Sequence, residues 1–399
     1  MNPDKKNFTP ASERLFTGEF LALNGIAFLA FCNMAVFFQF YLYLRTLPIA
    51  PEWNGFLIAL FSISGLILRP FVSPFLNPGN ARKWMLASVV AVVVSLFGYS
   101  FAMDFWSMFL IRFLHGIAYM VLGAALNARL VALIPPAKSG QAFGLITVIT
   151  LLPFALIPPI LDAATENLGG FVCVLNLAAV LMILIFPVSL AVKTDTEETS
   201  AGGRQNPGMV EIIANLKDKK VFALLLLMLL LYSSYTPVFF FLEGYAKSEG
   251  ILNPGLFLTL STFSEIGIRL AAGSLFDRIS KVYLVAGSLI VIAFGYWALA
   301  FFSGTIMFYS LGVFLGLGWG VAMPVLNAMM FDVSPVRLRG FNTNLGVQMF
   351  QGGFFVGPLA GGLILAHFDY RSVYLFSALL AMGAVALTPL LIPSKKTKN

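Results

Sequence analysis

Long apolar segments alternate with short polar segments along the whole 399-residue chain. Each apolar segment contains roughly 20 residues, enough for a helix to cross a hydrocarbon core of about 30 Å. The pattern predicts twelve transmembrane helices, six in each half of the chain. The predicted helices span residues 20–44, 54–76, 84–103, 105–134, 140–163 and 170–192, then 221–245, 255–276, 282–302, 305–332, 341–366 and 372–392. The expected fold class is an all-α polytopic membrane protein.

A polar segment divides the two halves. Residues 193–220 contain glycine and charges of both signs, as expected of a solvated linker between two helical bundles. The predicted domains are a cytoplasmic N-terminus (1–19), an N-terminal six-helix bundle (20–192), a cytoplasmic linker (193–220), a C-terminal six-helix bundle (221–392) and a cytoplasmic tail (393–399).

Composition agrees with this pattern and excludes other classes of protein. Hydrophobic residues make up 59% of the chain and charged residues 11%, whereas an average soluble domain is about 25% charged. The net charge of +7 does not indicate nucleic acid binding, because the Lys and Arg residues sit in short loops rather than on one face. Cys32 and Cys173 lie inside apolar segments, so neither a disulfide framework nor a metal cluster is expected.

The distribution of basic residues predicts the orientation of the chain. With the N-terminus inside, 18 of the 25 Lys and Arg residues fall on inner segments, three on outer loops and four within helices. Cytoplasmic loops retain positive charge during insertion, so both termini are expected in the cytoplasm. The first apolar segment has no small-residue cleavage site. We therefore expect a multi-pass protein of the bacterial cytoplasmic (inner) membrane, acting as a monomer.

An internal repeat relates the two halves at a constant offset of 200 residues. The matching residues are Arg69 and Arg269, Gly116 and Gly316, Leu126-Asn127-Ala128 and Leu326-Asn327-Ala328, Pro135 and Pro335, Gly140 and Gly340, and Pro158 and Pro358. Because each copy has six helices, both copies enter the membrane in the same orientation, as in the parallel repeats of certain transporters. The cleft between the halves is the expected substrate site.

The loop after the eighth predicted helix carries a family signature. It reads Gly273-Ser-Leu-Phe-Asp277-Arg278, which resembles the GxxxDR loop of the major facilitator superfamily. The resemblance covers essentially the full chain and is to twelve-helix, proton-coupled efflux members. It implies two pseudo-symmetric six-helix bundles that rock around a central site.

That resemblance implies gating roles for two loops. Asp277 at a helix end could pair with basic groups and the helix dipole of the other half, stabilising one conformation. In the equivalent loop after the second helix, Asn77 replaces the acidic residue and Arg82 follows, so a weaker effect is expected. The alternative for both is a positively charged loop that caps a helix.

A glycine-rich sequence in the eleventh predicted helix matches a second pattern. Gly353, Gly357, Pro358 and Gly361 fit GxxxGPxxGG, which the resemblance associates with the fifth helix of the family's antiporters. Its position here supports the repeat and close packing between the halves more than it supports antiport.

Polar residues in the fourth predicted helix share one face. They are Arg112, His115, Gly116, Tyr119, Gly123 and Asn127. Intramembrane charges usually face protein or water, so this stripe is expected to face a cavity. Arg112 followed by Gly116 resembles the family's RxxxG pattern, which implies proton or substrate coupling. Alternatively, Arg112 bonds nearby carbonyl groups and His115 is a neutral, packed imidazole, although imidazole can titrate near neutral pH.

The eighth predicted helix contains Glu265 and Arg269, four residues apart and therefore on one face. Glu265 lies near the middle of the segment. It is a candidate for proton or substrate coupling, or else a structural partner of Arg269. Arg269 and Arg69 occupy equivalent places in the two repeats, which suggests a shared role in gating.

Further polar residues that could contact a solute occur on the helices that line the cavity in this family. They are Asn24, Asn33, Gln39, Tyr232, Ser234, Tyr235, Glu243, Trp319, Asn327, Gln348 and Gln351. Each could instead form a hydrogen bond between helices. Together they suggest an amphiphilic cavity with aromatic walls.

The predicted function is secondary transport of a small organic solute, coupled to protons and directed outward. The alternative is a proton symporter that imports a metabolite, and a more distant one is a non-transporting sensor. No GxxxxGK[ST] sequence for nucleotide binding occurs, and no cofactor is expected. An enzyme is not expected, because the two histidines, His115 and His367, are far apart and there is no HExxH sequence.

Overall fold

The computed structural model describes residues 15–72, 75–135, 138–193, 209–276, 279–301 and 304–392. Its first half contains α1 (Gly18–Val36), η1 (Phe37–Gln39), α2 (Phe40–Leu44), α3 (Pro51–Val72), α4 (Ala81–Gly98), η3 (Tyr99–Phe101), α5 (Phe105–Ala132), α6 (Ser139–Ala164), α7 (Phe171–Ile183) and α8 (Ile185–Ser189). Its second half contains α9 (Met209–Leu216), α10 (Lys219–Ser248), α11 (Gly255–Phe276), α12 (Lys281–Phe301), α13 (Thr305–Val333), η5 (Val336–Leu338), α14 (Arg339–His367), α15 (Tyr370–Leu387) and η6 (Thr388–Leu391).

Eleven helical segments in the described residues are long and apolar enough to cross a membrane. The remaining long helix is α11, which has 22 residues and carries Glu265 and Arg269. The first span runs continuously through α1, η1 and α2, and the sixth through α7 and α8. The predicted all-helical membrane fold is thus confirmed, with boundaries shifted by a few residues.

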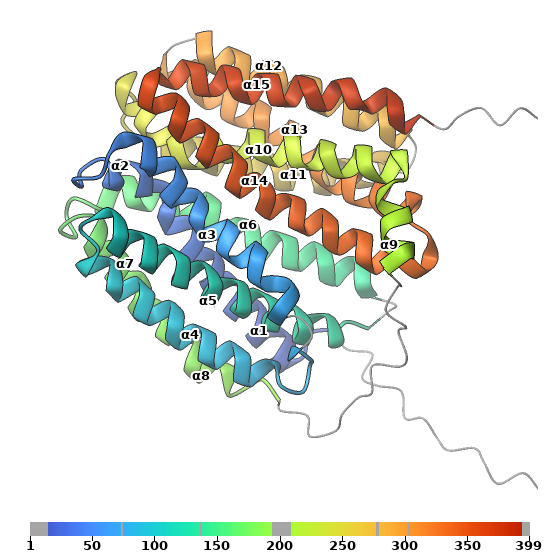
Figure 1. Ribbon diagram of the computed structural model, residues 1–399, viewed down its shortest axis with the longest axis horizontal. Helices are drawn as coiled ribbons and strands as arrows, with labels where there is room; N and C mark the ends of the chain where they lie inside the picture. The colour runs from blue at the N-terminus through green and yellow to red at the C-terminus, as the bar shows by residue number, and fades with distance from the viewer. Residues whose placement is uncertain are drawn as a thin grey trace, which may run out of the picture.

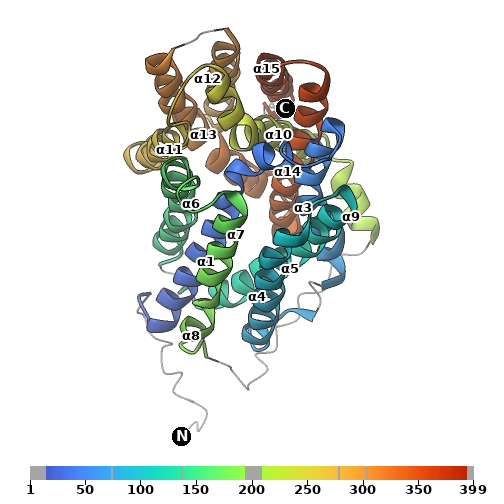
Figure 2. The same ribbon diagram turned by 90° about the vertical axis from the view of Figure 1, so that its left-hand side faces the viewer.

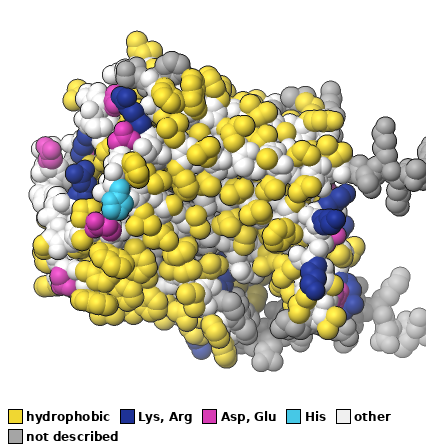
Figure 3. Space-filling model, turned by 45° about the horizontal axis from the view of Figure 1, so that its top comes forward, with side chains coloured by type: hydrophobic (Ala, Val, Ile, Leu, Met, Phe, Trp, Pro, Cys, Tyr) yellow, Lys and Arg dark blue, Asp and Glu magenta, His cyan; other side chains and the backbone are white. Residues whose placement is uncertain are grey.

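The helices form two bundles that lie against each other. Figures 1 and 2 show α10 to α15 on one side and α1 to α8 on the other, with α3 and α6 beside α14 and α11 at the boundary. We call the end where α1 begins and η6 finishes the terminal end, and the opposite end the distal end. Figure 3 shows a belt of hydrophobic side chains between two ends that carry charged residues. This distribution suits a protein surrounded by lipid acyl chains.

The internal repeat is visible in helix packing. The backbone of Gly116 on α5 lies against the Phe61 carbonyl on α3, and Gly316 on α13 lies in the same way against Ser261 on α11. All four positions are related by the 200-residue offset. In both halves a glycine therefore lets two helices approach closely at the same point.

Capping residues determine where several helices begin. Asp104 accepts hydrogen bonds from the backbone N–H groups of Trp106 and Ser107, forming a capping box at the start of α5. Hydrogen bonds from Ser107 hold the pKa of the Asp104 carboxyl below its ordinary value. Asp369 caps α15 through Ser372, and bonds from that residue likewise lower the pKa of Asp369.

The segment predicted as a solvated linker contains a helix. Helix α9 occupies residues 209–216, and its Asn215 is buried. Asn215 and Asn342 on α14 exchange two hydrogen bonds of 2.7 and 3.1 Å, and Asn342 also donates to Ser334 at 2.8 Å. The expectation of a wholly solvated linker is therefore wrong for α9, because the buried amide pair of Asn215 and Asn342 attaches this helix to the C-terminal bundle.

The two bundles meet closely at the distal end. Gly55 near the start of α3 touches the backbone of Pro358 and Gly362 on α14, and Gly255 at the start of α11 touches Pro158 and Pro159 on α6. Thr259 donates to the carbonyl of Ala155 across the same boundary, at 2.6 Å. All hydrogen bonds between bundles that the described residues form lie in this distal half.

Candidate functional site

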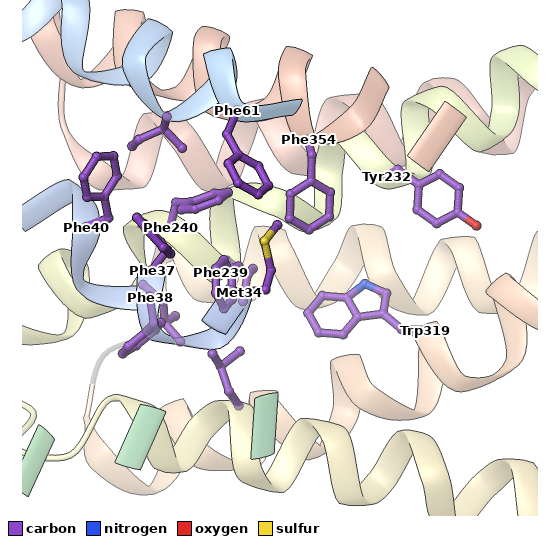
Figure 4. Close-up of a cluster of buried hydrophobic side chains, with 14 of the residues drawn as sticks. Met34, Phe37, Phe38, Phe40, Phe61, Tyr232, Phe239, Phe240, Trp319 and Phe354 are labelled. Atoms are coloured by element: carbon purple, nitrogen blue, oxygen red, sulfur yellow. The ribbon is translucent and has the colours of Figure 1, made fainter. Parts of the chain in front are cut away.

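A cluster of aromatic side chains lies where the two bundles converge. Figure 4 shows buried hydrophobic side chains from both halves: Met34, Phe37, Phe38, Phe40 and Phe61 come from the first, and Tyr232, Phe239, Phe240, Trp319 and Phe354 from the second. Phe38 meets Phe239 across the boundary, with ring centroids 6.1 Å apart. In this conformation the side chains pack against one another as part of the hydrophobic core. The predicted aromatic character of the region is thus present in the structure.

The polar centre of the C-terminal bundle is an ion pair. Arg269 Nη2 lies 2.5 Å from Glu265 Oε1, and Arg269 Nε donates to the Gly320 carbonyl at 3.3 Å. The Glu265 side chain is almost fully buried, whereas that of Arg269 is 20% exposed. The backbone of Glu265 lies against Gly320 on α13, the residue that follows Trp319. The pair therefore sits beside the aromatic cluster, with the arginine as its more accessible member.

Two further aromatic residues extend this centre. Tyr235 packs edge-on against Trp319, with ring centroids 4.6 Å apart. Trp319 is buried and donates its indole N–H to the hydroxyl of Tyr296 at 3.2 Å. Tyr232 packs against Gly353 and edge-on against Phe350. Tyr235 is the half-buried member, so it is the residue of this set with access to solute.

Arg112 and His115 are buried inside the N-terminal bundle. Arg112 is 2% exposed and donates to the carbonyls of Leu57 and Ile58 at 3.0 and 2.8 Å, and to the Tyr99 hydroxyl at 3.3 Å. Its guanidinium also lies within 5 Å of three phenylalanine ring centroids. The predicted cavity-facing stripe is therefore wrong for Arg112 in this conformation. Carbonyl bonding, the alternative, describes its surroundings.

His115 completes the same network. Its two ring nitrogens lie 3.2 Å from the Tyr99 hydroxyl and 3.3 Å from Asn33 Nδ2. The ring is fully buried, so it too does not face a cavity here. Asn33, predicted to line the cavity, is instead a partner of this histidine.

The other predicted cavity residues fall into three groups by burial. Asn127 on α5 and its repeat mate Asn327 on α13 are exposed, and both lie toward the terminal end. Tyr119 and Gln348 are half-buried, and the Tyr119 ring packs against Phe61. Asn24 is buried and donates to the carbonyl of Phe20 on its own helix. Asn127 and Asn327, toward the terminal end, are thus the most exposed of these residues.

Of the predicted gating residues, Asn77 forms a turn. Asn77 and Asn80 each accept a hydrogen bond from the other's backbone N–H, at 2.9 Å, just before α4 begins. These bonds stay within the turn, and Asn80, the N-cap residue of α4, makes no side-chain capping bond, so a gating role for Asn77 stays a prediction. Arg82 follows in the first turn of α4, and Arg69 lies half-buried near the end of α3. Gly273 lies in α11, whereas Asp277 and Arg278 are outside the described residues.

The glycine-rich sequence of α14 packs mainly within its own bundle. Gly353, Gly357 and Gly361 lie against Tyr232, Thr236 and Phe241 of α10, and Thr236 donates to the Gly353 carbonyl at 3.1 Å. At Pro358 and Gly362, helix α14 contacts Gly55 on α3 of the other half. The expected close packing between halves is therefore present at these two residues.

Sequence reasoning missed two carboxylates that make structural contacts. Glu19, placed in the polar N-terminus, lies inside α1 and forms a buried ion pair of 2.6 Å with Arg129 on α5. Asp162 on α6 accepts a hydrogen bond of 2.5 Å from the Gly255 backbone N–H across the boundary. Each is the sole acidic residue of its apolar stretch, which is the signal that could have identified it. Among the described residues no group of His, Cys, Asp and Glu could hold a metal ion.

Comparison with known proteins identifies the family. The sequence profile of the Major Facilitator Superfamily matches residues 23–351 and 255–399. The chain is 25% identical to the quinolone resistance protein NorA of Staphylococcus aureus (strain MRSA252), over 82% of this chain and 84% of that protein. It is 23% identical to the multidrug resistance protein MdtG of Proteus mirabilis (strain HI4320), over 82% of both.

Solved structures share the fold. The nucleoside transporter NupG has a TM-score of 0.75 at 15% identity, covering 95% of this chain and 100% of that one. A bacterial homologue of the human lysosomal transporter Spinster, in an inward-facing and unoccupied conformation, has a TM-score of 0.73 at 14% identity, covering 96% and 95%. Proteins of this family are transporters rather than enzymes, which confirms that expectation. The chain belongs to the major facilitator superfamily of membrane transporters.

Proposed function

We propose that this transporter exports a small organic solute by alternating access, in exchange for protons, and that its terminal end faces the cytoplasm. Closure of the distal end supports the alternating-access part of this proposal, because in a conformation that is closed on one side the solute binds from the other. The exposure of Asn127 and Asn327 toward the terminal end supports a cavity that opens there. The excess of basic residues on the same side supports its cytoplasmic location.

Glu265 is the residue we propose for coupling. It is buried beside the aromatic cluster and is neutralised only by Arg269 among the described residues. A cationic or hydrogen-bond-donating group of the solute could bind the deprotonated Glu265 in place of Arg269. Protonation of Glu265 would remove that carboxylate and release the solute. Solute and proton would thereby compete for one centre, as exchange requires.

Export rather than import is favoured by the relatives. NorA and MdtG are named for resistance to quinolones and to multiple drugs. The lipophilic walls of the aromatic cluster suit solutes of that kind. The structural likeness to NupG, at 15% identity, supports the fold and not the transported solute. Import of a metabolite is therefore the second candidate function.

Transport in inside-out membrane vesicles with an acidified lumen tests this proposal. The probes are ethidium, a labelled quinolone and a labelled nucleoside, with a pH dye in the lumen. We expect the wild type to accumulate at least one of the two drugs while protons leave. Glu265→Gln should abolish the dependence of uptake on the pH gradient.

Glu249→Gln provides the matched control, because Glu249 also pairs with an arginine, Arg371, but at the distal surface. It should transport as the wild type does. Proton-driven uptake of the nucleoside into intact cells, without drug accumulation in vesicles, would instead establish the importer. Gradient-dependent drug uptake that survives Glu265→Gln would remove this residue from the coupling step.

A further inference from the structure

A polar cavity lies at the distal end, between the two bundles and away from the Glu265 centre. Its volume is about 570 Å³, and its polar lining includes Gln39, Tyr43, Asp162, Glu166, Glu243 and Lys247. This volume is in the range of pockets that hold small organic ligands. Three carboxyl groups face one ammonium group in this lining. The cavity therefore favours positive charge.

Polar contacts across the boundary build the floor of the cavity. Gln39 Nε2 donates to Glu243 Oε1 at 3.2 Å, and Thr165 donates to Gln39 Oε1 at 2.7 Å. Asp162 accepts a hydrogen bond from the backbone N–H of Gly255 in the opposite bundle. The carboxylates are thus fixed by residues from both halves, which keeps them in place without a ligand.

Two polar atoms in the lining lack a partner. Glu243 is 1% exposed, and its Oε2 accepts no hydrogen bond from the described residues; the hydroxyl of Tyr43 is likewise buried and unpartnered. A buried carboxylate oxygen without a donor is costly. A ligand that supplies positive charge or a donor N–H would remove that cost.

Lys247 already supplies an ammonium group from within the chain. Its Nζ lies 2.8 Å from Glu243 Oε1, and its side chain is 58% exposed, so it reaches in from solvent. Tyr43 and Phe171 form an aromatic wall, with ring centroids 5.2 Å apart. Aromatic faces attract cations. The lining thus combines a carboxylate, an aromatic wall and a displaceable ammonium group.

From this arrangement we propose that the distal cavity is a second binding site, specific for an organic cation, in which the cation replaces Lys247 against Glu243. The site is separate from the Glu265 centre. Binding there requires neither a proton gradient nor a direction of transport, so its test can fail independently of the proposed function.

Protection of a single cysteine measures occupancy of this cavity. In the full chain, Cys32→Ser and Cys173→Ser remove the native thiols, and Thr46→Cys places one thiol in the cavity lining, where Thr46 is exposed. The probe is tetraphenylphosphonium, and the readout is the rate of maleimide labelling of the purified protein. We expect the cation to slow labelling. A thiol at Ile306, which is 85% exposed but outside the cavity, should not be protected.

Two substitutions should shift, in opposite directions, the concentration of tetraphenylphosphonium that halves the rate of maleimide labelling. Glu243→Gln should raise it at least about tenfold, because the attraction between the carboxylate and the cation is lost, and a tenfold change corresponds to about 1.4 kcal/mol. Lys247→Met should lower it, because the competing ammonium is gone, and a gain in affinity cannot arise from misfolding. Glu249→Gln, outside the cavity, should leave it unchanged.

The proposal fails under either of two results. Equal protection by neutral triphenylphosphine oxide would show that the cavity recognises apolar surface rather than charge. Protection unchanged by both Glu243→Gln and Lys247→Met would show that the cation binds elsewhere.

Discussion

Gly55 on α3 and Gly362 on α14 bring the two bundles into backbone contact, so close that a Cβ atom on either glycine would overlap the other residue. This contact lies at the distal end, where the bundles converge. Alternating access requires that it separate when the distal end opens. A larger side chain here should therefore act on the closed conformation alone.

Gly362→Val is expected to shift the transporter toward conformations that are open at the distal end. Inserting such a side chain into a tight contact costs about 1–3 kcal/mol, which corresponds to a population shift of roughly 5- to 150-fold. Spin labels replacing Phe101 and Ile306, exposed distal residues of the two halves, should move apart in pulsed electron resonance measurements.

Gly267→Ala is the control for this substitution. Gly267 lies on α11, and a Cβ atom added there would meet no other atom within 4 Å. Its label distances should match those of the wild type. An unchanged distance distribution in Gly362→Val would show that the glycine contact does not limit distal opening.

Arg112→Ala should destabilise the N-terminal bundle. The substitution removes two charge-assisted hydrogen bonds, which Arg112 donates to the carbonyls of Leu57 and Ile58 in addition to their helix bonds, at about 1.5–3 kcal/mol each. Arg112→Lys should recover only part of this, because an ammonium lacks the forked geometry of guanidinium. Thermal unfolding of the purified protein measures both effects.

The same variants separate the two roles considered for Arg112. If Arg112→Lys has near-normal stability but no proton-dependent transport, then Arg112 acts in coupling. If transport falls only in proportion to the amount of folded protein, its role is structural. Arg371→Ala, at the exposed distal pair with Glu249, should change neither property.

Asn342→Leu should release α9 from the C-terminal bundle. The change removes the amide pair with Asn215 and the bond to Ser334, each worth about 0.5–1.5 kcal/mol. Limited trypsin digestion should then cleave faster after Lys217, just beyond α9. Thr343→Ala alters the neighbouring residue, which is exposed, and should leave cleavage unchanged. Equal digestion of wild type and Asn342→Leu would show that other contacts hold α9.

Asp104 should make the stability of α5 depend on pH in the acidic range. Because hydrogen bonds lower the pKa of Asp104 in the folded protein, its stabilising effect is complete above the ordinary pKa of about 3.9 and is lost as pH falls through the lower, folded value. The unfolding midpoint of Asp104→Asn should therefore lie below that of the wild type at neutral pH. The two midpoints should converge once the pH is below the folded pKa of Asp104, where the carboxyl is protonated in both states. A difference that persists under those conditions would assign the effect to cap geometry rather than to charge.

Some features of this protein follow from local sequence. Helices near the predicted positions, the two six-helix halves and the ion pair between Glu265 and Arg269 all depend on residue spacing along one chain segment, because a helix converts spacing directly into direction. The repeat likewise places Gly116 and Gly316 at equivalent helix contacts. The family itself was recognisable from short motifs and their offset.

Tertiary structure decided which polar residues are paired and which face solvent. Arg112 and Asn127 share one helical stripe, yet the first is buried against carbonyls of α3 and the second is exposed. Asp162 and Glu243 are 81 residues apart and line one cavity only because the two bundles meet at the distal end. A sequence specifies the face of a helix on which a side chain lies, but the neighbour opposite that face depends on how the bundles pack, and in a transporter that packing differs between conformations.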